Sequence, residues 1–431
     1  MTLSTLSDGY MMRNVLELPE ILRMVLECLR YERYERDELF TALQVNKTWY
    51  MEVIRILWAN PPPSALAAIE RDDRRQFYAR FIRELNFDSE EKSAIELEPV
   101  HSAFRNLEFP RLKYIKDSNG YYDGREKRTI IYRQYIQPSL EIFNVSPVST
   151  EGLQDTLDLL STRCPRLEKF GIGVSLLEET TSVQLMNFFD NCRSLKAIRL
   201  AGHDDYSISD QLLAYFAGFS RLEELSMGKN GDRLYKVLEM TNQLQPFRNI
   251  RILSLLYVDS NSVPLLVEVL KNAKSLTELN LGLHDFDTNP LPHVSSLVNL
   301  QELSVTVLCS SNWCRSDFLA LSKLKNLKVL GICSSGGHDI TCPEVTDEDF
   351  SSVFENLTEL EKLDFGVNCD LSIASLNALG TCCRKLVTCR MIGRFDLDDW
   401  FAPDKSQMTL FPCLELLQLD AVYLGSHRRT R

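Results

Sequence analysis

One apolar pattern, L-x-x-L-x-L, recurs through most of the chain and limits what it can fold into. Clear copies read RLEKFGI, SLKAIRL, RLEELSM and NLQELSV. A repeat of this kind, at a mean interval of about 28 residues, means that one short unit is stacked on copies of itself. The thirteen first apolar positions are Ile82, Leu112, Leu140, Leu167, Leu195, Leu222, Ile250, Leu276, Leu300, Leu327, Leu360, Leu386 and Leu414.

Each repeat reads as a strand, a turn and a helix. The alternating end of L-x-x-L-x-L predicts a short strand, whereas the connecting segments, such as VPLLVEVLKNA, carry apolar residues at helical spacing. Stacked strands need about 4.8 Å and stacked helices about 10 Å, so the stack must bend toward its strands. The pattern resembles leucine-rich repeats, and we expect an α/β chain with a curved solenoid, or horseshoe, of about 13 repeats.

The cysteines fit the repeat register. The position three residues before the first leucine is apolar or Cys in twelve of the thirteen repeats. Cys164, Cys192 and Cys383 therefore read as small buried hydrophobes rather than metal ligands. Twelve cysteines without a disulfide framework, behind an N-terminus that does not read as a secretory signal, indicate a reducing compartment, cytoplasmic or nuclear. We expect no metal and no cofactor.

The front of the chain breaks the repeat. Residues 14–63 contain LPEILRMVLECL, LFTALQVN and KTWYMEVIRILW, which predict three short helices in a unit too small to be robust alone. These motifs resemble an F-box of the kind that precedes leucine-rich repeats in fungi. Two features depart from the family pattern: Asn46 stands where many relatives have Cys, and the link between the first two helices is long.

The F-box resemblance implies a substrate receptor of a Skp–cullin–F-box ubiquitin ligase. Its partners would be a Skp-family adaptor, through it a cullin–RING ligase, and a protein substrate held by the repeats. The residues expected to bind the adaptor are Leu18, Pro19, Ile21, Leu22, Val25, Leu43, Val45, Asn46 and Trp49. Trp49 fits either an adaptor contact or the core of the module itself, whereas Trp58 is expected to pack on the first repeat.

The substrate surface is expected on the inner face and in the loops that follow the strands. The middle x of each L-x-x-L-x-L points to that face. The candidate residues are Arg199, Ser226, Lys229, Asn280, Trp313, Asp364 and Arg390. Trp313 is equally compatible with a buried cap. The acidic segment around Asp347 reads first as a solvated loop, and second as a site for a basic substrate.

Other functional classes find little support. A net charge of −12 argues against nucleic acid, and no segment approaches the roughly 18 apolar residues of a membrane span. Because no nucleotide-binding, hydrolase or metalloprotease motif is present, we expect no enzyme activity. The alternatives are a scaffold that binds the adaptor without degrading a target, and a small-GTPase regulator, which the front module disfavours. The domains are therefore a tail (1–13), an F-box (14–63), repeats (64–424) and a basic tail (425–431).

Overall fold

The computed structural model describes residues 18–31, 36–90, 94–117, 132–148, 150–174, 179–201, 209–229, 246–259, 263–284, 289–335, 338–396 and 410–423. The chain divides into two compact units, residues 1–167 and 168–431, and each is treated separately below. Both predicted tails, 1–13 and 425–431, lie outside the described residues. The F-box and repeat boundaries stay predictions.

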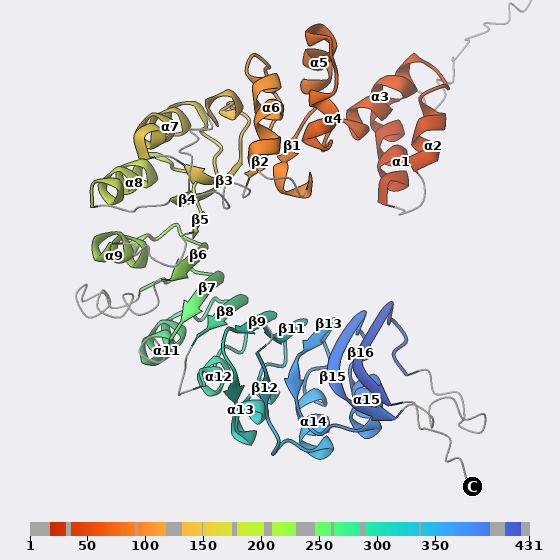
Figure 1. Cartoon of the computed structure of the whole chain (residues 1–431), viewed down its shortest axis with the longest axis vertical. Coiled ribbons are helices and arrows are strands. Elements are labelled where there is room, and N and C mark those ends of the chain that lie inside the picture. The colour runs from red at the N-terminus through yellow and green to blue at the C-terminus, as the bar shows by residue number, and fades with distance from the viewer. Residues whose placement is uncertain are drawn as a thin grey trace, which may run out of the picture. The chain divides into compact units, whose positions relative to one another are not determined.

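Unit 1 begins with three helices, α1 (Pro19–Tyr31), α2 (Arg36–Ala42) and α3 (Lys47–Leu57), which we call the helical module (Figure 1). Its first repeats follow as α4 (Pro63–Ala67), α5 (Asp72–Ala79), β1 (Glu84–Asn86), η2 (Phe87–Glu90), α6 (Ala94–Phe104), β2 (Tyr114–Asp117), η4 (Tyr132–Tyr135), β3 (Ile142–Val148) and α7 (Thr150–Arg163). The strands β1, β2 and β3 pair in parallel.

Unit 2 continues the alternation. Its main strands are β4 (Lys169–Val174), β5 (Ala197–Ala201), β6 (Glu224–Lys229), β7 (Ile252–Val258), β8 (Glu278–Leu283), β9 (Glu302–Val307), β11 (Val329–Ser334), β13 (Lys362–Phe365), β15 (Thr388–Asp396) and β16 (Leu416–Tyr423). Its helices are α8 (Glu179–Asn191), α9 (Asp210–Gly218), α11 (Val263–Asn272), α12 (Leu291–Val294), α13 (Arg315–Leu319) with η5 (Ala320–Lys323), α14 (Asp347–Phe354) and α15 (Ile373–Cys382).

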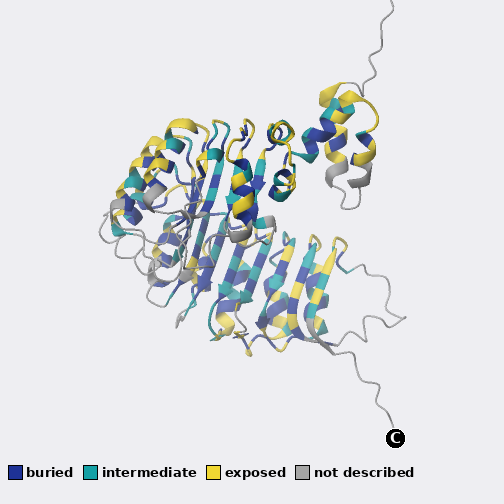
Figure 2. Cartoon of the chain, turned by 45° about the horizontal axis from the view of Figure 1, so that its top comes forward, coloured by how far each residue is buried: buried dark blue, intermediate teal, exposed yellow. Residues whose placement is uncertain are grey.

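The predicted repeats are confirmed. Thirteen main strands follow one another in chain order, one for each L-x-x-L-x-L, so the chain is a leucine-rich-repeat solenoid of the α/β class. Within unit 2 the sheet curves with its strands on the inner side and its helices outside (Figure 1). Along most main strands buried and partly exposed residues alternate, as the period of two requires (Figure 2); β4, β5 and the end of β8 instead have consecutive buried residues.

One backbone turn sets the register of all thirteen strands. The N–H of the first apolar residue donates to the carbonyl three residues earlier, as in Leu112 to Phe109 and Leu276 to Ala273. This turn presents the next N–H groups to the preceding repeat, where those of Lys113 and Tyr114 share the carbonyl of Arg83. The same link recurs along the stack, because a buried backbone group needs a partner.

A polar residue just before the first leucine supports the same stacking. Its side chain donates to a backbone carbonyl of the preceding repeat, as Asn249 does to Ser220 and Asn326 does to Val298. Sequence reasoning missed this row of side chains. The signal was present as a recurring Asn, Ser or Arg at that position.

The predicted burial of Cys164, Cys192 and Cys383 is confirmed, and all twelve cysteines are free thiols. The Cys164 thiol lies at the end of the helix of its own repeat and donates to the carbonyl of Gln137 in the preceding repeat at 3.2 Å. Burial raises the pKa of Cys164 and of Cys383 to about 12, which keeps both thiols protonated.

A second sheet was not predicted. The two-residue strands β10 (Ser311–Asn312), β12 (Ile340–Thr341) and β14 (Val367–Asn368) pair in parallel after the main strands of their repeats. They lie in three consecutive repeats, and the middle one, which contains β12, is the longest of the chain. Pairing gives the backbone groups of these short strands hydrogen-bond partners.

Gly282 in β8 packs against a bulge in β7. A Cβ at this position would overlap the carbonyl oxygen of Leu256 and lie 2.6 Å from its carbonyl carbon. Because backbone atoms must move to make room, we expect Gly282→Ala to lower the free energy of unfolding by about 1–3 kcal/mol. Gly331→Ala is the matched control, since its Cβ would meet nothing nearer than Ser304 Oγ at 3.5 Å. Urea denaturation of both variants checks the prediction, and equal losses would contradict it.

Candidate interaction surfaces

The helical module is held together by a small apolar core and one buried carboxylate. The core residues are Leu22, Leu26, Leu39, Ala42, Val53 and Ile56. Glu52 on α3 is 2% exposed, and its carboxylate accepts from Arg23 on α1 at 3.0 Å and from Arg55. Shared pairing offsets the cost of burying the charge and fixes α1 against α3.

An apolar stripe runs along the exposed side of α1. Leu18, Ile21, Val25 and Cys28 are spaced by three, four and three residues, so they share one helix face, which we call the α1 stripe. Leu18 is 38% exposed and Val25 is 41% exposed, while Ile21 is partly buried. Unlike the adjoining core face, this stripe has much of its apolar surface in contact with water.

The other predicted adaptor residues divide into three groups. Pro19 and Val45 are exposed, whereas Leu43 and Trp49 are half-buried and pack against the core. Asn46 is the N-cap of α3, and its Oδ1 accepts from the N–H groups of Thr48 at 2.9 Å and Trp49 at 3.0 Å. Trp49 thus fits the module-core interpretation.

Leu22 requires a correction. It is fully buried in the core of the module, because it lies on the face of α1 that packs against α2 and α3. It cannot contact an adaptor in this conformation, and we leave it out of the surface.

Three exposed apolar side chains on the module were missed by sequence reasoning: Met24, Phe40 and Tyr50. Met24 lies three residues after Ile21, so it widens the α1 stripe. Phe40 follows the buried Leu39, and only a known helix orientation shows that it faces outward. A Phe beside a core leucine gave no separate signal in the sequence.

The predicted position of Trp58 is confirmed. Its ring stacks on Tyr78 of α5, with ring centroids 4.3 Å apart and an interplanar angle of 22°. The pKa of the Tyr78 hydroxyl is raised, mainly by burial and to a smaller extent by the charge and hydrogen bond of Tyr50. Aromatic packing therefore joins the helical module to the first repeat.

The inner face of the sheet carries a row formed by the middle x of each repeat, which we call the inner row. Strand pairing sets its members opposite one another, as in Arg199 with Ser226 and Asp364 with Arg390. Arg199 and Arg390 are exposed, and Ser226, Asn280 and Asp364 are partly exposed. Arg390 lies 3.7 Å from Asp364, the only ion pair between inner-row residues in the described part of the chain. The Lys229 side chain lies outside the described part.

Trp313 requires a second correction. It is 3% exposed and follows β10, and its backbone N–H donates to the carbonyl of Thr341 at 2.8 Å. The tryptophan is therefore a buried cap on the small second sheet, the alternative that the sequence left open. It cannot contact a substrate.

The acidic segment divides into two groups of carboxylates. Asp339, Glu344 and Glu348 are exposed, as a solvated segment requires, whereas Asp347 and Asp349 bind neighbouring helices. Asp349 is buried, forms a capping box with Thr346 and accepts from Arg315 at 2.6 Å and 2.8 Å. Asp347 accepts from the N–H and hydroxyl of Ser372 and from the hydroxyl of Ser375. These carboxylates link α14 to its neighbours on both sides.

Both carboxylates make the stability of unit 2 sensitive to acid. The hydrogen bond from Arg315 lowers the pKa of Asp349. At Asp347 burial alone would raise the pKa, but the hydrogen bonds from Ser372 and Ser375 outweigh burial, so its pKa is also lowered. Each carboxylate has a lower pKa in the folded protein than in the unfolded chain, where it is near 3.9. It therefore stabilises the folded protein above about pH 4, and this stabilisation is lost as the pH falls through the folded pKa.

We therefore expect Asp347→Asn to destabilise the protein at neutral pH, by a difference that shrinks below about pH 4. Calorimetric melting of wild type and variant across that range checks this. Asp339→Asn is the control, because Asp339 lies exposed in the same repeat. A difference that stays constant with pH would count against the assignment.

A buried polar cluster in unit 1 is the nearest thing to a chemical site. His101 Nδ1 lies 2.8 Å from the Tyr135 hydroxyl, and the Tyr132 hydroxyl donates to Asp117 at 3.2 Å. His101 Nε2 also lies 3.2 Å from Asp117, although poorly aligned for a hydrogen bond. Burial raises the pKa of both tyrosines well above the ordinary value. All four side chains are buried, so none of them is presented to solvent.

Neither metal nor membrane features emerge from the described part of the chain. It holds no group of three or more His, Cys, Asp or Glu side chains that could bind a metal ion. None of its helices combines the length and apolar character needed to cross a membrane.

The fold and surfaces define an α/β leucine-rich-repeat protein with a helical module ahead of its repeats. No protein-family model and no curated protein matches the sequence. The chain is similar to a solved structure of the Rad7 and Elc1 complex in yeast, at 15% identity and a TM-score of 0.33, over 80% of this chain and 92% of that chain.

Two further structures show a similar likeness. Internalin C2 from Listeria monocytogenes is 18% identical with a TM-score of 0.27, over 62% of this chain and 84% of that chain. The other is the leucine-rich-repeat ectodomain of the Arabidopsis thaliana membrane receptor kinase GASSHO1/SCHENGEN3, solved in complex with CASPARIAN STRIP INTEGRITY FACTOR 2. It is 15% identical with a TM-score of 0.26, over 69% of this chain and 39% of that chain. The class of protein rests on the repeats themselves, not on these likenesses.

Proposed function

We propose that this protein is the substrate-recognition subunit of a Skp–cullin–F-box ubiquitin ligase. The helical module binds a Skp-family adaptor, and the repeats hold the protein to be ubiquitylated. The protein itself carries out no chemistry. It raises the effective concentration of a substrate lysine near the charged conjugating enzyme.

The observation that carries this proposal is the α1 stripe. A module of three short helices has a core of its own, yet it leaves Leu18, Val25 and Val45 about 40% to 55% exposed. Clustered exposed apolar side chains mark a protein interface. The F-box resemblance of the same motifs supports an adaptor as the partner, with Pro19, Ile21, Leu43 and the capped turn at Asn46 shaping its edge.

The substrate is proposed to bind the inner row in unit 2. Arg199 and Arg390 are its exposed cations, and Ser226, Asn280 and Asp364 supply smaller polar groups. A surface with both signs of charge suits a protein partner better than a phosphate backbone. Lys229 stays part of this proposal, whereas Trp313 does not.

Size-exclusion chromatography of the purified full chain with a purified Skp-family adaptor tests the docking half. We expect a stable complex, and separate elution at micromolar concentrations would sink the proposal. Affinity purification with and without a ligase inhibitor tests the other half. A target that accumulates only with the inhibitor supports degradation, whereas one bound equally under both conditions favours the non-degradative scaffold.

A further inference from the structure

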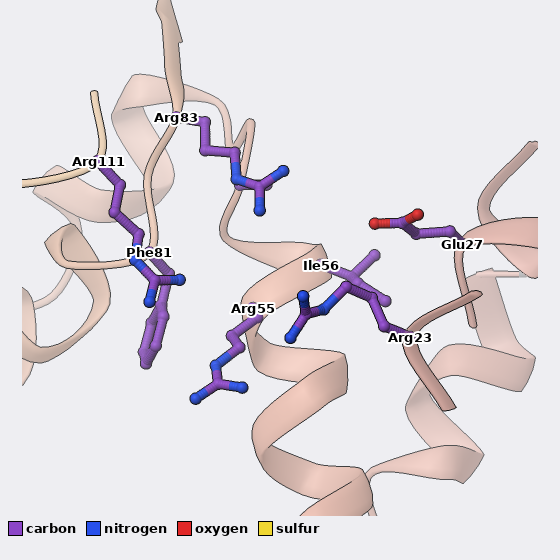
Figure 3. Close-up of a pocket in the computed structure, with 8 residues that line it drawn as sticks. Arg23, Glu27, Arg55, Ile56, Phe81, Arg83 and Arg111 are labelled. Atoms are coloured by element: carbon purple, nitrogen blue, oxygen red, sulfur yellow. The ribbon is translucent and has the colours of Figure 1, made fainter. Parts of the chain in front are cut away.

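A hollow in unit 1, between the helical module and the first two repeats, is lined by four arginines. Arg23 comes from α1 and Arg55 from α3, while Arg83 precedes β1 and Arg111 precedes β2. Figure 3 shows their side chains extending toward a common space beside Phe81. We call this hollow the arginine pocket.

The floor of the arginine pocket is apolar. Ile56, Ala59 and Phe81 line it and are all buried. Arg83 and Arg111 are exposed, so this apolar surface excludes water from only one side of an ion in the pocket, and it strengthens contacts with the guanidinium groups on that side.

The positive charge in the arginine pocket exceeds the negative charge. Arg23 and Arg55 share the single carboxylate of Glu52 behind them, and Glu27 on the rim is the only acidic lining residue. Arg83 and Arg111 have no ion pair among the described residues. Two positive charges are therefore uncompensated, in a protein whose net charge is −12.

A second observation also indicates a missing acceptor. Nε of Arg55 is buried and makes no hydrogen bond within the described part of the chain, although another nitrogen of the same guanidinium binds Glu52. A buried donor without a partner costs roughly 1–3 kcal/mol, which an acceptor oxygen in the pocket would recover.

We propose that the arginine pocket binds a phosphate group in its dianionic form. Two uncompensated positive charges match a dianion, and planar guanidinium groups donate in pairs to phosphate oxygens. Since the four arginines come from the module and from both of the first repeats, the bound anion would link the helical module to the start of the solenoid. This role is separate from adaptor binding, because the α1 stripe contains none of these arginines.

Calorimetric titration of the full chain, in a buffer free of phosphate, tests the proposal. The probes are inorganic phosphate, a peptide with one phosphoserine, and the same peptide unphosphorylated. We expect saturable binding of both phosphorylated probes and none of the third. Tighter binding of the phosphopeptide would place the phosphate on a protein partner, and equal binding would identify the free anion. Either result supports the pocket.

The test variant is Arg83→Ala with Arg111→Ala, and the matched control is Arg80→Ala with Arg105→Ala, two exposed arginines of unit 1 outside the pocket. We expect the test variant to lose at least about tenfold in affinity and the control to keep its affinity. If the test variant melts early without ligand, the corresponding double Gln variant replaces it, since Gln keeps more of the side-chain packing.

Phosphate should also raise the melting temperature of wild type but not that of the test variant. The proposal is overturned if wild type shows no saturable binding of either phosphorylated probe. It is also overturned if test and control variants bind phosphate equally well.

Discussion

Asp117→Ala is expected to lower the free energy of unfolding of unit 1 by about 2–4 kcal/mol. Asp117 is 2% exposed at the end of β2, and its carboxylate accepts from the Tyr132 hydroxyl and lies beside His101. Alanine removes the acceptor but leaves both partners buried, where water cannot replace it. Phe87, stacked on His101 at 4.4 Å, and the neighbouring aromatic rings leave little room for relaxation.

Hydrogen–deuterium exchange of the full chain is the suitable measurement, because it reports unit 1 separately from unit 2. Peptides covering α6 and β2 should lose protection, while those covering β8 and β9 should not. Asp88→Ala is the control: Asp88 pairs with Lys116 at 2.9 Å, but both side chains are partly exposed, so a loss of about 0–1 kcal/mol is expected. Unchanged protection in the Asp117 variant would show that the cluster contributes little.

The repeats were predictable because their signal is periodic and local. A chain that places Leu222, Ile250 and Leu276 at one interval can bury them only by stacking equivalent strands, and the observed pairing of β6, β7 and β8 follows that register. The buried cysteines were predictable for the same reason. They occupy a position that other repeats fill with Phe, Leu or Ala.

What sequence reasoning missed depends on contacts between repeats. His101 meets Tyr135 across 34 residues, and the arginine pocket gathers side chains from four segments. The burial of Trp313 and the contacts of Asp347 could not be decided from the sequence, because their partners, Thr341 and Ser372, lie 25 or more residues away. The carboxylate of an acidic residue at a helix start can accept hydrogen bonds either from nearby protein groups or from water. The sequence alone does not show which of these it does.

The helical module shows the same limit in its amphipathic helix. Spacing identified both Leu22 and Val25 as apolar positions of α1, but one fills the core and the other faces water. The apolar stripe of α1 is wider than the surface that α2 and α3 cover, so some of its residues are left for a partner. Only the packing of α2 and α3 shows which residues belong to the core. The exposed half of that stripe is the part that the proposed function requires.

Leu18→Ala combined with Val25→Ala is expected to weaken binding of a Skp-family adaptor by about 2–4 kcal/mol, or roughly 30-fold to 1000-fold in Kd. Both side chains are more than one third exposed, so their truncation creates no cavity in the module. The loss should therefore appear in binding rather than in stability. Titration calorimetry with the purified adaptor measures the first, and a melting curve measures the second.

The matched control is Val298→Ala combined with Leu416→Ala, which truncates the same two residue types at exposed positions of unit 2. It should bind the adaptor like wild type, because neither residue belongs to the helical module. If the Leu18 and Val25 variant melts normally and also binds like wild type, the α1 stripe is not the docking surface. If it melts early, Leu18→Gln with Val25→Thr retains side-chain volume while making the stripe polar. Normal melting with lost binding in that second variant then separates an interface from a structural role, because only an interface requires the stripe to be apolar.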